Sequence, residues 1–432
     1  MSMFDINKIR EDFPILKRKV HGHDLVYFDS GATSQKPLQV IEVMDKYYRE
    51  TNANIHRGVY EMSVESTRLV DEARAGVAGF IGGRSEEIIF TRNTSESINL
   101  VAYSWGEENI FEGDAVVITK LEHHSNMIPW QELCRRKGAE LRIVDVNGEG
   151  ELENEKKVTQ CHSDMGDKGL RVVIGGWKEL LDNKVKMVAF TGQSNVLGTV
   201  TPMEMIVKMI RNKSPKALIL VDGAQMVPHL SVDVIKMGVD FLAFSGHKML
   251  GPTGVGVLWG KRKVLNKMKP FLMGGDMIGE VKLTGATWAE LPSKFEAGTP
   301  DIAGIVGMGA AVKYLKQIGM DNIHEHEKEI LKYALEKMMV LEKEGLVTLY
   351  GPDIESRGGA ISFNVVGVHA HDTAQILDSF GIAVRSGQHC AAPLVTGFGV
   401  SAMVRATFYL YNTKEEIDYM ISKISEVPKV FA

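Results

Sequence analysis

The chain has 432 residues, a net charge of -5, and a composition that is 44% hydrophobic and 24% charged. This composition is that of a globular enzyme, and the length predicts one large and one smaller lobe rather than a single core. The sequence shows no dense Lys/Arg run, no signal peptide and no apolar stretch of about 20 residues, so we expect a cytoplasmic protein that binds neither nucleic acid nor membrane.

The first two thirds of the chain read as alternating helices and strands. An amphipathic helix is expected over 6–13, a strand over 25–29, and a helix over 61–81. From residue 88 onward, short apolar runs alternate with helical stretches, at 88–90, 115–119, 141–144, 185–190, 217–221 and 241–244. Short apolar strands separated by helices predict a mostly parallel sheet that is covered on both faces.

The pattern changes after residue 300. Helical periodicity is expected over 305–318 and 323–344, followed by strands at 347–350, 360–365 and 383–385. We interpret residues 301–432 as a small α+β domain, 23–300 as the large domain, and 1–22 as an N-terminal segment that packs with the small domain.

Two neighbouring strands of the predicted sheet end in groups that can do chemistry. Asp222 ends the run 218–221, and Lys248 follows the run 241–244. Ligands bind beyond the carboxyl ends of parallel strands, so both side chains should meet at one crevice. A lysine that forms an imine with an aldehyde, and a carboxylate that keeps a pyridine nitrogen protonated, are what pyridoxal 5′-phosphate requires. The alternative is a surface lysine and a turn aspartate.

The run 88–100 reads as strand, tight turn and helix start, and it offers a place for a phosphate. Free amides at a helix N-terminus lie there beside the hydroxyls of Thr94 and Ser95, and Ser245 and His247 could add further donors. Simple N-capping of the helix would use the same residues. After the strand 115–119, His123 offers an imidazole that could stack on a cofactor ring, or it could be structural.

The three cysteines are widely spaced, which argues against a disulfide framework or a structural metal site. Cys390 lies in a Gly-containing loop beside His389 and Arg385, where a thiol can have a lowered pKa and act as a nucleophile. A small packing residue is the alternative. Cys134, within a helical stretch, reads as a packing residue, and Cys161 has no assigned role.

Arg405 stands within the apolar run 403–408, where burial of a guanidinium requires an anionic partner. A substrate carboxylate would supply that partner through paired hydrogen bonds. A carboxylate of the protein itself is the alternative.

Over nearly its whole length the sequence resembles the group II, SufS-type cysteine desulfurases and the related selenocysteine lyases, which are aminotransferase class V enzymes of the fold type I pyridoxal phosphate group. The resemblance implies an α/β fold, with a mostly parallel seven-stranded sheet in the large domain and a smaller α+β C-terminal domain. The blocks that carry it are 27–32, 54–58, 92–99, 122–124, 194–199, 221–225, 245–248, 251–254, 296–300, 385–393 and 411–413.

Residue roles follow from the resemblance. It implies that Lys248 carries the cofactor, that His123 stacks on it and shuttles protons, and that Cys390 accepts sulfur. The remaining cofactor contacts would come from Asp222 at the pyridine nitrogen, Gln225 at the phenolic oxygen, Asn195, and a phosphate site of Thr94, Ser95, Ser245, His247 and, from a second subunit, Thr299. Substrate would be bound by Arg405, Asn195, His56 and Arg57.

The implied function is conversion of L-cysteine to L-alanine, with sulfur held as a Cys390 persulfide for iron-sulfur cluster assembly. A homodimer and a sulfur-acceptor or scaffold protein are the implied partners. Two alternatives stay open: a selenocysteine lyase acting on L-selenocysteine, and a non-catalytic scaffold in sulfur assembly. The stretch 154–184 is longer than the family usually carries and has no assigned function.

Overall fold

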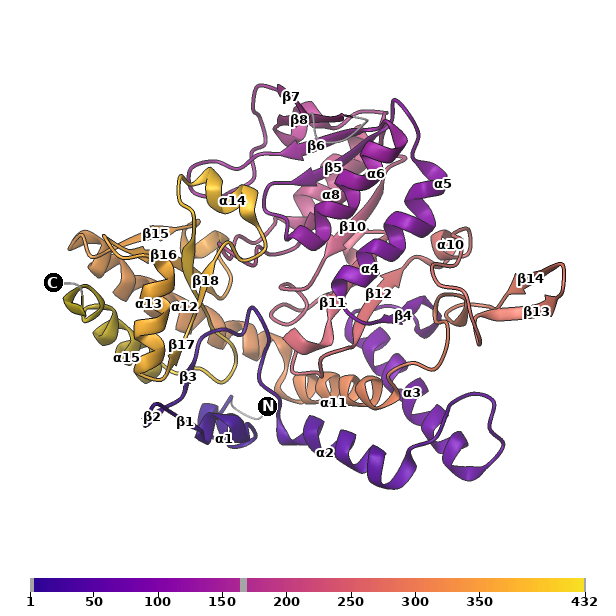
Figure 1. Ribbon diagram of the computed structural model, residues 1–432, viewed down its shortest axis with the longest axis horizontal. Coiled ribbons are helices and arrows are strands. Elements are labelled where there is room, and N and C mark those ends of the chain that lie inside the picture. Colours follow the sequence, from indigo (N-terminus) through magenta and orange to yellow (C-terminus); the bar gives the residue numbers. More distant parts are fainter. Residues whose placement is uncertain (1–3, 164–168, 431–432) are drawn as a thin grey trace.

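The computed structural model describes residues 4–163 and 169–430. Within them, the main feature is a sheet of nine strands that is mostly parallel, which confirms the predicted α/β class (Figure 1). Among these nine strands, β12 and β7 run in the direction opposite to the others. In spatial order the strands are β4 (Ile88–Thr91), β12 (Gly256–Gly260), β11 (Phe241–Ser245), β10 (Leu218–Asp222), β9 (Val185–Thr191), β5 (Ala115–Thr119), β6 (Glu140–Val144), β8 (Leu170–Gly175) and β7 (Thr159–Ser163).

The number of strands corrects the sequence-based expectation of seven. The two extra strands, β8 and β7, come from the long stretch 154–184 and extend the sheet beyond β6. β8 pairs with β6 in parallel, and β7 pairs with β8 antiparallel. β7 was not predicted because its sequence, Thr-Gln-Cys-His-Ser, lacks the apolar alternation that marks a strand.

Helices cover both faces of this sheet, because alternate residues of each strand point to opposite sides. Val117 and Val221 pack into one buried cluster with helices α3 (Glu61–Phe80), α8 (Met203–Lys213) and α11 (Ile302–Ile318). Ile118 and Leu220 pack into another with α4 (Thr94–Val101) and α6 (Ile128–Lys137). Burial on both faces explains why the central strands read as continuous apolar runs.

A second, antiparallel sheet follows in the order β15 (Val347–Tyr350), β16 (Ala360–Val365), β19 (Met403–Thr407) and β18 (Arg385–Gly387). It shares a hydrophobic cluster with residues of α12 (Met320–Lys343), α13 (Ala370–Ser379) and α15 (Lys414–Ile424). In Figure 1 this part lies beside the large sheet, and α14 (Ala392–Gly397) lies between the two.

The N-terminal segment contacts the second sheet's part of the chain. β3 (Val26–Tyr27) pairs in parallel with β17 (Ile382–Ala383), and Arg10 of α1 (Ile6–Glu11) forms an ion pair with Glu416 at 2.7 Å. These contacts include residues on both sides of position 22, so the exact domain boundaries stay a prediction. No helix in the described ranges is both long and apolar enough to cross a bilayer.

A close backbone approach connects β12 to the turn that begins α4. A Cβ atom on Gly256 would lie 2.4 Å from the Cα atom of Asn93, so only glycine fits without moving the turn. Asn93 caps α4 by accepting a hydrogen bond from the Glu96 N–H at 3.0 Å. Gly256 therefore fixes the position of the helix N-terminus.

We predict that Gly256→Ala lowers the free energy of unfolding by about 1–3 kcal/mol, because the added methyl group must displace backbone. Gly76→Ala is the matched control: it lies within α3, nothing lies within 4 Å of its added Cβ, and it should stabilise the helix by ~0.5–1 kcal/mol. Urea denaturation of the two variants measures both changes. Equal effects of the two substitutions would contradict the importance of this contact.

Candidate active site

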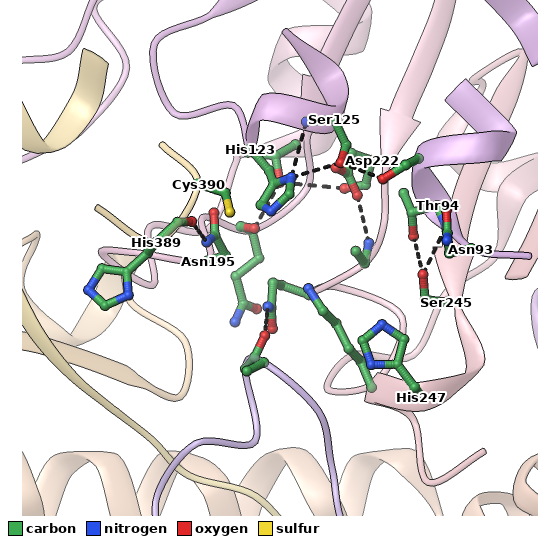
Figure 2. Close-up of a pocket in the computed structure, with 18 of the residues that line it drawn as sticks. Asn93, Thr94, His123, Ser125, Asn195, Asp222, Ser245, His247, His389 and Cys390 are labelled. Atoms are coloured by element: carbon green, nitrogen blue, oxygen red, sulfur yellow. Dashed lines mark hydrogen bonds between the residues drawn. The ribbon is translucent and has the colours of Figure 1, made fainter. Parts of the chain in front are cut away.

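A cavity of about 320 Å³ opens at the carboxyl ends of β5, β9, β10 and β11, next to the loop that follows β18. Figure 2 shows the side chains that face into it. Most residues singled out from the sequence line this one space: Thr94, Ser95, His123, Asn195, Asp222, Gln225, Ser245, His247, Lys248, Cys390 and Arg405.

Lys248 and Asp222 face this cavity from neighbouring strand ends. Burial lowers the pKa of the Lys248 amine to about 8, and Asp222 partly opposes this shift. Burial also raises the pKa of Asp222, which is 3% exposed, although the Ala224 N–H donates to its carboxylate at 2.9 Å. Among the described residues, the Lys248 amine has no hydrogen-bond partner. Both groups are therefore available to a ligand.

His123 follows β5 and is held as a neutral ring with a defined tautomer. Its Nδ1 accepts hydrogen bonds from the Ser125 N–H at 3.1 Å and from the Ser125 hydroxyl at 2.9 Å, so the ring proton lies on Nε2. Burial, followed by the charge of Lys248, lowers the pKa of His123 to about 4. The ring is thus uncharged near neutral pH and can donate from Nε2.

Hydroxyl groups gather where α4 begins. Thr94 donates its backbone N–H to the Ser245 hydroxyl at 2.9 Å, and the Thr94 and Ser245 hydroxyls lie 2.7 Å apart. The Ser95 and Ser125 hydroxyls lie 2.5 Å apart. His247 lines the same cavity, and burial lowers its pKa to about 4. Neutral donors beside a helix N-terminus are suited to holding a phosphate group.

Arg405, on β19, is 2% exposed. It forms an ion pair with a carboxylate of the protein itself, which was one of the two alternatives from the sequence. Its Nη2 lies 3.1 Å from Asp29 Oδ1, and its Nη1 donates to the Asn195 carbonyl at 2.7 Å. Its Nε is buried without a partner among the described residues. Arg385 also pairs with Asp29, at 2.9 Å. One carboxylate therefore faces two guanidinium groups, which leaves the site with excess positive charge.

Cys390 is exposed and lies on the cavity wall near His123 and Asn195, as Figure 2 shows. Cys390 and the preceding His389 both have left-handed backbones, with φ of 55° and 51°. This conformation costs a residue with a side chain about 1–2 kcal/mol. Cys134 is buried, and burial raises the pKa of its thiol to about 12, which fits a packing role. The Cys161 side chain lies outside the described part of the structure.

Three expected residues lie elsewhere in the single chain. Thr299 lines a different surface pocket, and its hydroxyl lies 3.4 Å from Asn54 Oδ1. His56 lines another pocket, and Arg57 forms an ion pair with Asp276 at 2.9 Å. The single chain therefore does not bring these residues to the cavity.

Sequence reasoning missed the cavity residue Ser125 and two contacts that position other residues of the site. Ser125 sets the His123 tautomer, and its position two residues after His123 in the same turn was an available signal. Gln225 was expected at the cofactor, but its donation to the Gly31 carbonyl at 2.6 Å was not. Asp29 gave no signal, because its partner Arg405 is 376 residues away.

The residues present fit pyridoxal 5′-phosphate. The buried carboxylate of Asp222 and the amine of Lys248, whose pKa is lowered, face one cavity. The amine has no hydrogen-bond partner among the described residues. A neutral imidazole lies beside them, and hydroxyl donors lie at the N-terminus of α4. This donor set matches an aldehyde, a pyridine nitrogen, an aromatic ring and a phosphate on one ligand.

Comparisons with known proteins agree with this geometry. Residues 26–420 match the family model described as aminotransferase class-V. A probable cysteine desulfurase of Staphylococcus aureus is 46% identical over 430 residues, covering 99% of this chain and 98% of the relative. A probable cysteine desulfurase of Halalkalibacterium halodurans is 46% identical over 98% of both chains.

Solved structures give the same result. The apo structure of a cysteine desulfurase from Thermococcus onnurineus has a TM-score of 0.88 and 38% identity, covering 98% of each chain. The structure of the cysteine desulfurase CsdA (S-sulfonic acid) of Escherichia coli has a TM-score of 0.85 and 30% identity, covering 99% of this chain and 100% of that one.

We predict that the reductive methylation of Lys248 by trace formaldehyde rises as the pH increases through about 8. The neutral amine is the reactive form, so reactivity appears above the pKa, whereas ordinary surface lysines respond near pH ~10.4. Peptide mass spectrometry of the cofactor-free protein follows each lysine. A Lys248 profile that matches the surface lysines would contradict the effect of burial.

Proposed function

The chain belongs to the aminotransferase class-V family, among its cysteine desulfurases, and we propose that it converts L-cysteine to L-alanine with transfer of sulfur to Cys390. The observation that carries this proposal is that Lys248, Asp222 and Cys390 line one cavity. A lysine and a carboxylate alone would support many reactions of this family. An exposed thiol on the same wall supports sulfur transfer.

The cofactor of the family, pyridoxal 5′-phosphate, supplies an electron sink that acidifies the α-hydrogen of a bound amino acid. Lys248 would hold it covalently through Nζ, and Asp222 would face its pyridine nitrogen. His123 would lie against the ring, and Gln225 near the phenolic oxygen. The phosphate contacts would come from Thr94, Ser95, Ser245 and His247.

The proton steps use groups whose charge is already set by burial. The Lys248 amine, with a pKa of about 8, can take up a proton near neutral pH and return it. Asp222 would accept a hydrogen bond from the cofactor's pyridine nitrogen and so keep that nitrogen protonated. His123 presents Nε2–H, because Ser125 occupies Nδ1. The neutral ring can donate a hydrogen bond from Nε2 to the reacting atoms of the substrate.

The substrate carboxylate has a place beside Arg405. The Nε of Arg405 is buried without a partner in the described residues, so a substrate carboxylate at this place would meet an unused hydrogen-bond donor. Asn195 lines the same wall, although its amide donates to the His389 carbonyl at 2.8 Å. Binding at Arg405 would bring the substrate sulfur toward Cys390.

Sulfur transfer itself balances without an external oxidant. The Cys390 thiolate attacks the substrate sulfur, and an S–S bond forms as the substrate's carbon–sulfur bond breaks. The electron pair of the broken bond stays with carbon, which takes up a proton and becomes the methyl group of alanine. L-Cysteine and the enzyme thiol thus give L-alanine and an enzyme persulfide.

Partner subunits and acceptors are further parts of the proposal. His56, Arg57 and Thr299 lie outside the cavity of their own chain, which supports a homodimer in which they serve the partner's site. Val59 is 97% exposed on the same stretch as His56, which supports an apolar contact there. Because Cys390 is exposed, its persulfide can pass to an acceptor protein for iron-sulfur cluster assembly.

We predict that the purified protein loaded with pyridoxal 5′-phosphate shows a visible absorbance band that shifts when L-cysteine is added. Alanine and, with a reductant present, sulfide should form in equal amounts, because each turnover releases one of each. Absorbance spectra and product assays test both. A colourless protein that fails to retain the added cofactor would contradict the proposal and favour a non-catalytic scaffold.

We predict that Cys390→Ser lowers alanine formation from L-cysteine by about 100-fold or more but largely preserves alanine formation from L-selenocysteine. Selenium is the better leaving atom and needs no attacking thiol, whereas sulfur does. Cys134→Ser, at a buried thiol, is the control that should not separate the substrates. Equal loss on both substrates in Cys390→Ser would mean that Cys390 is structural.

A further inference from the structure

A single residue, His124, binds the backbone at Cys390 and just after it. The His124 N–H donates to the Cys390 carbonyl at 2.7 Å. The His124 Nε2 accepts a hydrogen bond from the Ala392 N–H at 3.0 Å. These two contacts hold the chain at the carbonyl of the cysteine and two residues after it. They come from the turn after β5, which also carries His123.

The loop needs such support because its own conformation is strained. His389 and Cys390 are consecutive residues with positive φ, and neither is a glycine. Within the loop, the Ala391 N–H donates a backbone hydrogen bond to the Gln388 carbonyl at 2.9 Å. The other anchors are Asn195, which donates to the His389 carbonyl, and the His389 ring, which donates from Nε2 to the Met403 carbonyl at 3.0 Å.

His124 holds the loop as a neutral ring. Because Nε2 accepts from Ala392, the ring proton must lie on Nδ1. Partial burial lowers the pKa of His124 and so favours this neutral form. His124 does not line the cavity, so it is separate from the groups that meet the cofactor or substrate.

We propose that His124 is a positioning residue that fixes the Cys390 thiol for attack on the substrate sulfur, an inference that rests on the proposed desulfurase function. The attack requires the thiol to stay within bonding reach and in line with the breaking bond. A displacement of about 1 Å can lower such a step about 100-fold. Cofactor binding and proton abstraction do not involve Cys390 and proceed without the two contacts.

Two substitutions separate this role from a general structural one. His124→Phe keeps a planar ring but removes the acceptor, so the Ala392 N–H loses its partner. His124→Gln replaces the acceptor with an amide oxygen at similar reach and should restore the contact. His23→Phe is the control, because His23 is an exposed histidine far along the chain from this turn.

With L-cysteine, His124→Phe should lower kcat about tenfold or more, whereas His124→Gln and His23→Phe should stay within about threefold of the parent. With L-selenocysteine, all variants should keep the parent kcat within about threefold, because that reaction does not need the thiol. The cofactor absorbance band, and the L-cysteine concentration that half-saturates its shift, should be the same in all of them.

Unchanged desulfuration in His124→Phe would overturn the inference. Equal losses on both substrates, or a His124→Gln variant as poor as His124→Phe, would also overturn it, since they indicate damage to the whole site. Failure of the parent protein to form alanine from L-cysteine would instead refute the proposed function. The two failures are therefore distinguishable.

Discussion

The burial of two opposite charges, the Asp222 carboxylate and the Lys248 amine, is the constraint on which the rest of the site depends. Asp222 ends β10, and Lys248 lies in the turn after the adjacent strand β11. Removal from water raises the pKa of Asp222 and lowers the pKa of Lys248. Such burial is costly unless a partner compensates for it. The sheet, whose central strands are buried on both faces, holds these two groups at one edge. A ligand that carries both an aldehyde and a basic nitrogen offsets the cost.

The second sheet contributes what the first lacks, namely a nucleophile and a binding group for an anion. Arg405 joins the two parts, since it bonds to Asp29 near the N-terminus and to the Asn195 carbonyl after β9. The Cys390 loop is joined to the large sheet through His124 and Asn195. These contacts place groups from three distant stretches of sequence around one cavity. The position of each thus depends on the docking of the two sheets.

Sequence reasoning was strongest where local pattern and chemistry coincide. The apolar runs before Asp222 and Lys248 identified both the strand ends and the residues at the cavity. It was weaker for β19, because the charge of Arg405 interrupts the apolar pattern, and for β12, whose ends are the glycines Gly256 and Gly260. The pairing of Asp29 with Arg405 could not be predicted, because contacts between distant segments follow from tertiary packing. The roles expected of His56, Arg57 and Thr299 came only from the resemblance, and their side chains lie away from the cavity of the same chain.

The two strands added at the end of the sheet illustrate how such a fold can accept new sequence. β8 pairs with the edge of β6 that faces away from β5, so the pairings from β4 to β6 do not involve it. Four strands separate β8 from β11, which leads to Lys248. Extra sequence at this end of the sheet therefore lies away from the strands that position the cavity residues. The price is a new open edge at β7, and its polar sequence lowers the risk that this edge recruits another chain into fibrous aggregates.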